Sequence, residues 1–75
     1  MINIYDFFGN IIKQNRIRLG YTQETLAGLA SVSNVYISKL ERGQVNPSCK
    51  ILQKLFDALE IDTSNIFIYD INSNF

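Results

Sequence analysis

The sequence predicts a small all-α fold, a compact bundle of five helices. Three observations support this prediction. Apolar residues recur at helical spacing, cap residues and glycines separate these recurrences, and 75 residues with 47% hydrophobic content suffice for one core. Helices suit so short a chain because their backbone hydrogen bonds are local. We therefore expect one domain over residues 1–75.

The first helix is expected to begin between Ile4 and Asp6, to run to Leu19 and to end at Gly20. Glycine favours such an end because it adopts the left-handed conformation at little cost. Apolar residues at helical spacing define the buried face of this helix: Phe8, Ile11, Ile12 and Leu19, with Phe7 and Ile17 flanking them.

Two short helices joined by a tight turn are expected between Thr22 and Gly43. Thr22 and Ser33 are expected to cap them, Ser31 and Val32 to make the turn, and Gly43 to end the second of them. The apolar residues of the pair are Leu26, Ala27, Leu29 and Ala30 in the first helix and Val35, Ile37 and Leu40 in the second.

The rest of the chain is expected to add a fourth helix and a short fifth. Residues 44–46 form a loop, after which Ser48 caps the fourth helix or Pro47 occupies its first turn. Asp62 can cap the fifth helix over residues 63–67. The end, residues 68–75, is open to three interpretations: a strand-like arm, a tail or an interface. The core face of the fourth helix comprises Ile51, Leu52, Leu55, Phe56 and Leu59.

Composition argues against several classes of protein. The chain has no histidine and one cysteine, Cys49, which we expect to be a small buried hydrophobe, so neither a metal site nor an internal disulfide is expected. No secretion signal or membrane span is recognisable, which favours a cytoplasmic location. No nucleophile–base pair or glycine-rich phosphate loop is present, so we expect no enzyme and no cofactor.

The zero net charge hides a basic body and an acidic end. Residues 7–54 hold all seven basic residues and two acids, a balance of +5, whereas residues 55–75 hold four acids and no base. This asymmetry is compatible with nucleic-acid binding but also with an ordinary charged surface.

The third helix is expected to present a polar face that suits DNA reading. Ala27, Val32, Ile37 and Leu40 are expected to hold it against the second helix. Asparagine can pair with adenine, lysine can donate to guanine, and a valine methyl can contact thymine. The candidates for base contact are Ser33, Asn34, Val35, Tyr36, Ser38 and Lys39, and those for phosphate contact are Gln23, Arg42, Asn46 and Lys50.

Three segments in one order and spacing show a family resemblance: FGNIIKQNRIRLGYTQETLA, VSNVYISKLERGQVNPS and ILQKLFDALEID. With them, the chain resembles the lambda-repressor-like (Cro-type, XRE) helix-turn-helix family from about Phe8 to Phe67. The resemblance implies that the third helix enters the major groove and that Gln23 clamps a phosphate. It also implies a structural ion pair between Arg16 and Glu41. Ser31 departs from the family, which often has glycine there; if the turn needs a positive φ, serine costs about 1 kcal/mol.

The resemblance further implies a homodimer on a palindromic double-stranded DNA operator. Residues 68–75 are a candidate dimer seam together with their neighbours, and packing onto the chain's own core is the alternative; the candidate interface residues are Ile66, Phe67, Ile68, Tyr69 and Ile71, with Phe75 beyond them. No small-molecule ligand or membrane partner is implied, and RNA polymerase would be a partner if the protein activates transcription.

Among short members of the family, the chain looks most like the controllers of restriction–modification systems. Its size, the run Tyr36-Ile37-Ser38 and the apolar end support this likeness. The alternative is an antitoxin or adaptor that uses the same fold to bind a protein.

Overall fold

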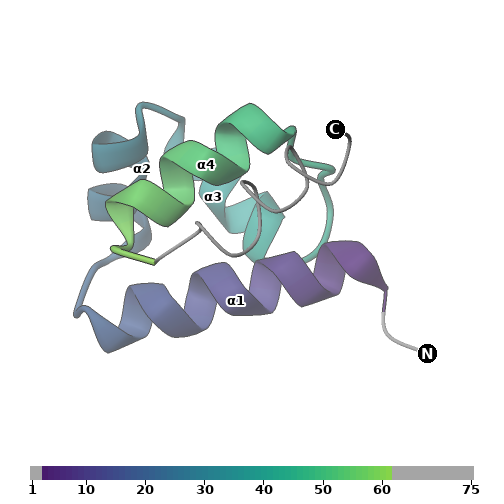
Figure 1. Cartoon of the computed structure of the whole chain (residues 1–75), viewed down its shortest axis with the longest axis horizontal. Coiled ribbons are helices and arrows are strands. Elements are labelled where there is room, and N and C mark those ends of the chain that lie inside the picture. Colours follow the sequence, from purple (N-terminus) through teal and green to yellow (C-terminus); the bar gives the residue numbers. More distant parts are fainter. Residues whose placement is uncertain (1–2, 62–75) are drawn as a thin grey trace, which may run out of the picture.

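The computed structural model describes residues 3–61 of the chain, and these residues form four α-helices (Figure 1). The helices are α1 (Ile4–Arg18), α2 (Gln23–Ala30), α3 (Asn34–Glu41) and α4 (Cys49–Ala58). The described part contains no strand, as the all-α prediction requires. The fifth helix expected over residues 63–67, and residues 68–75, lie outside the described residues, so four of the five expected helices are confirmed.

Each helix begins at a residue whose side chain accepts a hydrogen bond from a backbone amide of the first turn. The caps at Thr22 and Ser33 confirm the sequence predictions, and Asn3 caps α1 in the same way. Of the two alternatives for the start of α4, the structure has Ser48 as the cap. Gly20 follows α1 with a φ of 74° and Gly43 follows α3 with a φ of 73°, so both glycines end helices as expected.

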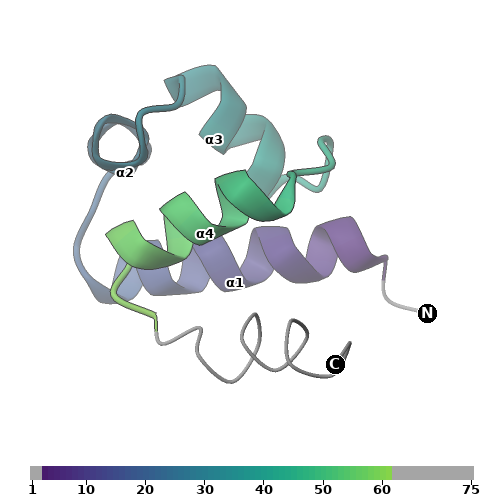
Figure 2. The ribbon, with the colours of Figure 1, turned by 45° about the horizontal axis from the view of Figure 1, so that its top comes forward.

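The four helices close around one apolar core. The pairs α1–α3, α2–α3 and α2–α4 are in contact, and Figure 2 shows α2 almost end-on beside α3. The side chains that the core excludes completely from solvent come from all four helices and from the residue that follows α4. They are Ile12, Leu26, Ile37, Leu40, Leu55 and Leu59.

Two predictions about burial are wrong. Leu29 is 55% exposed, because α2 turns Leu26, Ala27 and Ala30 toward the core and Leu29 lies beyond the edge of that face. Cys49 is exposed as well. It is the first residue of α4, one turn before the first core residue of that helix, and Pro47 is the buried residue at this end.

The turn between α2 and α3 needs a left-handed residue, and Ser31 supplies it at a φ of 57° and ψ of 42°. A residue with a Cβ is strained there by about 1–2 kcal/mol, a strain that glycine avoids. Since glycine also raises the entropy of the unfolded chain, we expect Ser31→Gly to raise the free energy of unfolding by about 0.5–1 kcal/mol. Urea denaturation measures this change. Ser31→Ala, which removes the hydroxyl but keeps the Cβ, is the control, and equal stability of the two variants would contradict the explanation.

Candidate nucleic-acid interface

The outward arc of α3 is exposed and chemically mixed. Val35 is 63% exposed, and Asn34 and Lys39 beside it are exposed too, whereas Ile37 and Leu40 on the opposite side are completely buried. The buried residues Ile37 and Leu40 hold α3 in place, and the exposed Val35 side chain is therefore an apolar surface that nothing in the described chain covers. The arc therefore offers an amide, a methyl surface and a cation on one rigid element.

The other three base-contact candidates are either engaged in a cap or less exposed than the residues of this arc. Ser33 is exposed, but its hydroxyl oxygen caps α3 by accepting a hydrogen bond of 3.0 Å from the backbone nitrogen of Tyr36. The Tyr36 ring is half-buried against the core, and this burial raises the pKa of its phenol, which stays protonated and able to donate. Ser38 is half-buried. Tyr36 and Ser38 thus present less surface than the sequence pattern indicates.

Arg16, Gln23 and Glu41 form one hydrogen-bonded network behind α3. The Arg16 guanidinium binds the Glu41 carboxylate twice, from Nε to Oε2 at 2.6 Å and from Nη2 to Oε1 at 3.1 Å. The Gln23 amide nitrogen donates to the same Oε1, also at 3.1 Å. The expected Arg16–Glu41 pair is therefore present, and its carboxylate side chain is only 3% exposed.

This network fixes how Gln23 is presented. A carboxylate only accepts, so the amide nitrogen of Gln23 must face Glu41, which leaves its second N–H and its carbonyl oxygen for another partner. Arg16 also donates to the backbone oxygen of Tyr21 at 2.9 Å, just before α2. The start of α2 and the end of α3 are thereby tied together through α1. The Gln23–Glu41 bond joins residues 18 positions apart, and no local pattern in the sequence signals it.

The remaining phosphate candidates are exposed and follow the end of α3. Arg42 is the C-cap of α3, Asn46 lies in the loop before α4, and Lys50 lies in the first turn of α4. Arg16–Glu41 is the only ion pair found within residues 3–61. Lys39, Arg42 and Lys50 therefore have no carboxylate partner in the described part of the chain, and their charges are available to an anion.

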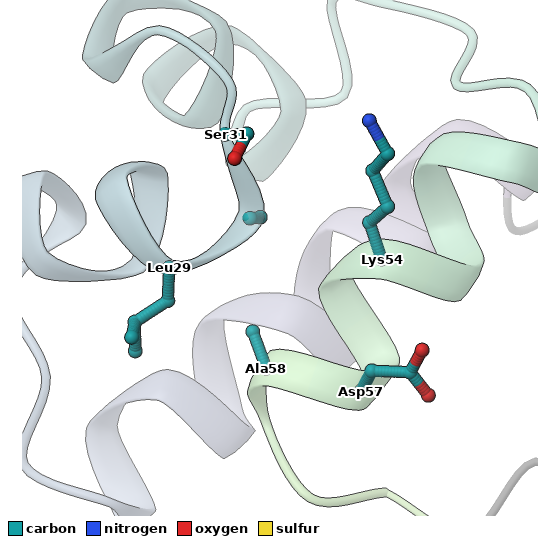
Figure 3. Close-up of a pocket in the computed structure, with 6 residues that line it drawn as sticks. Leu29, Ser31, Lys54, Asp57 and Ala58 are labelled. Atoms are coloured by element: carbon teal, nitrogen blue, oxygen red, sulfur yellow. The ribbon is translucent and has the colours of Figure 1, made fainter.

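No cluster of three potential metal ligands occurs between residues 3 and 61, and no helix there is long and apolar enough to cross a membrane. An open hollow of about 420 Å³ lies between the end of α2 and the second half of α4 (Figure 3). Leu29, Ala30, Ser31, Lys54, Asp57 and Ala58 line it.

Comparison with known proteins agrees with this geometry. Residues 12–66 match the family model described as helix-turn-helix. The chain is 42% identical over 60 residues to the HTH-type transcriptional regulator SlrR of Bacillus subtilis, covering 79% of this chain and 40% of SlrR. It is 37% identical over 59 residues to SinR of the same organism, another HTH-type transcriptional regulator, covering 77% of this chain and 53% of SinR.

A third relative is an HTH-type transcriptional regulator of Archaeoglobus fulgidus, with 37% identity over 59 residues. That match covers 79% of this chain and 83% of the relative. The chain thus spans about half or less of SinR and SlrR, but most of the archaeal protein.

Proposed function

This chain belongs to the helix-turn-helix family, and we propose that it is a transcriptional regulator that reads double-stranded DNA through α3. One observation supports this most directly. The opposite side of α3 is fixed in the core by Ile37 and Leu40, which are fully buried. The exposed arc is flanked by Arg42 and Lys50, which have no carboxylate partner among the described residues. A rigid helix of this kind fits the major groove, where base edges differ in their donors, acceptors and methyl groups.

The candidate residues divide between bases and backbone. Asn34, Val35 and Lys39 contact base edges, with Ser33, Tyr36 and Ser38 at the margin of the contact. Gln23 offers its second N–H to a phosphate, an arrangement that its bond to Glu41 supports. Arg42, Asn46 and Lys50 hold the backbone beyond the end of α3. Phosphate contacts fix the register of the protein, and base contacts give the sequence preference.

Two copies of the chain bind one operator in this proposal. A single α3 reads only a few base pairs, and a two-fold axis places two such helices about 34 Å apart on a palindromic site. The proposed seam is the apolar end of the chain, which lies outside the described residues: Ile66, Phe67, Ile68, Tyr69 and Ile71.

A finer assignment is the control of a restriction–modification system. The support is the run Tyr36-Ile37-Ser38 and the apolar composition of residues 66–71. If the protein activates transcription, RNA polymerase is its further partner. An adaptor or antitoxin that binds a protein through the same fold is the alternative, and it has no need of unpaired cations beside α3.

Lys39→Ala and Arg42→Ala are expected to weaken DNA binding in different ways. Lys39→Ala should reduce discrimination at one base pair by about 1–3 kcal/mol, because it removes a base contact. Arg42→Ala should weaken all duplexes alike, because a phosphate contact carries no sequence information. Titrations against single-base variants of the selected duplex measure both effects. Lys54→Ala, at the α2–α4 hollow, is the matched control, and the proposal fails if it weakens binding as much as the other two.

Binding is also expected to fall steeply as salt rises. Each neutralised phosphate releases counterions, so the slope of log affinity against log salt is about −0.9 per contact. Arg42→Ala in both copies of a dimer should therefore make the slope shallower by about two. A slope near zero would instead favour a protein partner.

Selection of bound duplexes from a random pool is the most direct test. A palindromic consensus would support DNA reading, dimerisation and a half-site spacing near one helical turn together. A consensus with a single half-site would overturn the proposed dimer but would still support DNA reading by α3. Failure to enrich any duplex would overturn the proposed function.

A further inference from the structure

One side of α1 carries an apolar stripe that extends beyond the core. Ile4 is 60% exposed and Phe7 is 49% exposed. Phe8 and Ile11 are half-buried and pack against the core. The four residues follow helical spacing and so lie along one side of the helix, which we call the α1 stripe. The rings of Phe7 and Phe8 meet edge to face, with centroids 5.7 Å apart.

Two adjacent phenylalanines and two isoleucines at the edge of a core form a continuous apolar surface. A single exposed apolar residue, such as Ile17 elsewhere on α1, needs no explanation. A continuous stripe on so small a domain is different, because covering it would enlarge a core that is otherwise limited by chain length. We therefore expect another apolar segment to cover the stripe.

The described chain ends next to the helix that bears this stripe. The Arg18 guanidinium at the end of α1 donates to the backbone oxygen of Leu59 at 3.3 Å, and α4 ends beside this part of α1 in Figures 1 and 2. Ile61, the last described residue, is half-buried against the core. Whatever follows Ile61 starts within reach of the stripe.

The segment that follows has the length and composition to cover the stripe. From Arg18 back to Ile4, α1 is about 21 Å long at 1.5 Å per residue, and 14 residues follow Ile61. Even at the rise of a helix, 14 residues reach about as far, and an extended chain reaches further. The segment is rich in large apolar residues: Ile66, Phe67, Ile68, Tyr69, Ile71 and Phe75. Its acids, Asp62 and Asp70, are opposite in charge to Arg18 of α1, which lies on the same side of the helix as the stripe.

We propose that residues 62–75 dock along the α1 stripe of their own chain. Four consecutive apolar residues, 66–69, cannot all face one way in a helix or in a strand. One side of the segment therefore covers the stripe, and another side remains apolar for a second copy. The proposal does not depend on DNA binding. The apolar side left for a second copy rests on the dimer proposed above, and the docking deepens that proposal by placing the seam over α1.

Disulfide trapping in the full chain tests this docking, since Cys49 is the only cysteine and Cys49→Ser removes it. In that background Phe7→Cys is combined in turn with Ile66→Cys, Phe67→Cys, Ile68→Cys and Tyr69→Cys. We expect mild oxidation to give a disulfide within one chain for some of these four pairs, at a yield that does not change with protein concentration. Non-reducing electrophoresis separates such products from cross-linked dimers.

Lys13→Cys is the matched control, because it is exposed on the same helix but lies on the side away from the stripe. Ile4→Cys replaces Phe7→Cys if circular dichroism shows that the latter does not fold. The proposal is overturned if no pair forms within a chain, if disulfides form only between chains, or if the control reacts equally well. DNA is absent from the assay, so a failure of the proposed DNA binding would leave this result unaffected.

Discussion

Gly9→Ala is expected to lower the free energy of unfolding by about 2–4 kcal/mol, despite alanine's higher helix propensity. A Cβ built on Gly9 would collide with the backbone oxygen of Leu40 and would lie 3.1 Å from the backbone oxygen of Glu41. Both atoms belong to the backbone of α3, so no side-chain rotation can relieve the contact. The two helices would have to separate, which would loosen the packing of Ile12 and Leu40 in the core.

Gly28→Ala is the matched control for this prediction. Gly28 lies inside α2, and a Cβ there meets nothing within 4 Å, so alanine should raise the free energy of unfolding by about 0.5–1 kcal/mol. Urea denaturation followed by circular dichroism measures both variants. If Gly9→Ala were as stable as the unmodified chain, α1 and α3 would not approach as closely as described.

The contrast between these glycines shows where sequence reasoning succeeds. Helix ends depend on local chemistry, so Thr22 and Ser33 as caps and Gly20 as a terminator follow from their neighbours alone. Gly9 acts through Leu40 and Glu41 of α3, more than 30 residues later, whereas the sequence pattern alone marks it only as a weak helix former. Its role depends on tertiary contact and has no local signature.

Burial at the margin of a helix face is equally hard to infer. The fully buried residues Leu26, Ile37 and Leu40 occupy the centre of their faces, and periodicity predicts them. Leu29 and Cys49 lie at the side and at the end of such faces, where the neighbouring helix decides whether a residue is covered. An apolar pattern therefore predicts which side of a helix faces the core, but not how many residues at the margin of that side are buried.

The candidate interface divides in the same way. The outward position of Asn34, Val35 and Lys39 follows from the spacing of Ile37 and Leu40, because a helix that buries one side must expose the other. The contact of Gln23 with Glu41 joins α2 directly to α3, and only the tertiary structure reveals it.

Glu41→Ala is expected to lower the free energy of unfolding by about 3 kcal/mol or more. The substitution leaves the Arg16 guanidinium, whose side chain is 14% exposed, without its carboxylate partner, and removal of one member of a buried pair typically costs about 3–5 kcal/mol. It also frees Gln23, whose amide nitrogen loses its acceptor. Urea denaturation measures the loss. Glu24→Ala, an exposed glutamate in the first turn of α2, is the control, with an expected change within about 1 kcal/mol.

Gln23→Ala separates the structural and the DNA-binding roles of this network. The Arg16–Glu41 pair would keep both of its hydrogen bonds, so stability should change by about 1 kcal/mol or less. If Gln23 clamps a phosphate, DNA affinity should nevertheless fall for every sequence, because a backbone contact is lost. Unchanged affinity would mean that Gln23 only supports Glu41. A stability loss as large as that of Glu41→Ala would mean that the amide, rather than the ion pair, holds α2 to α3.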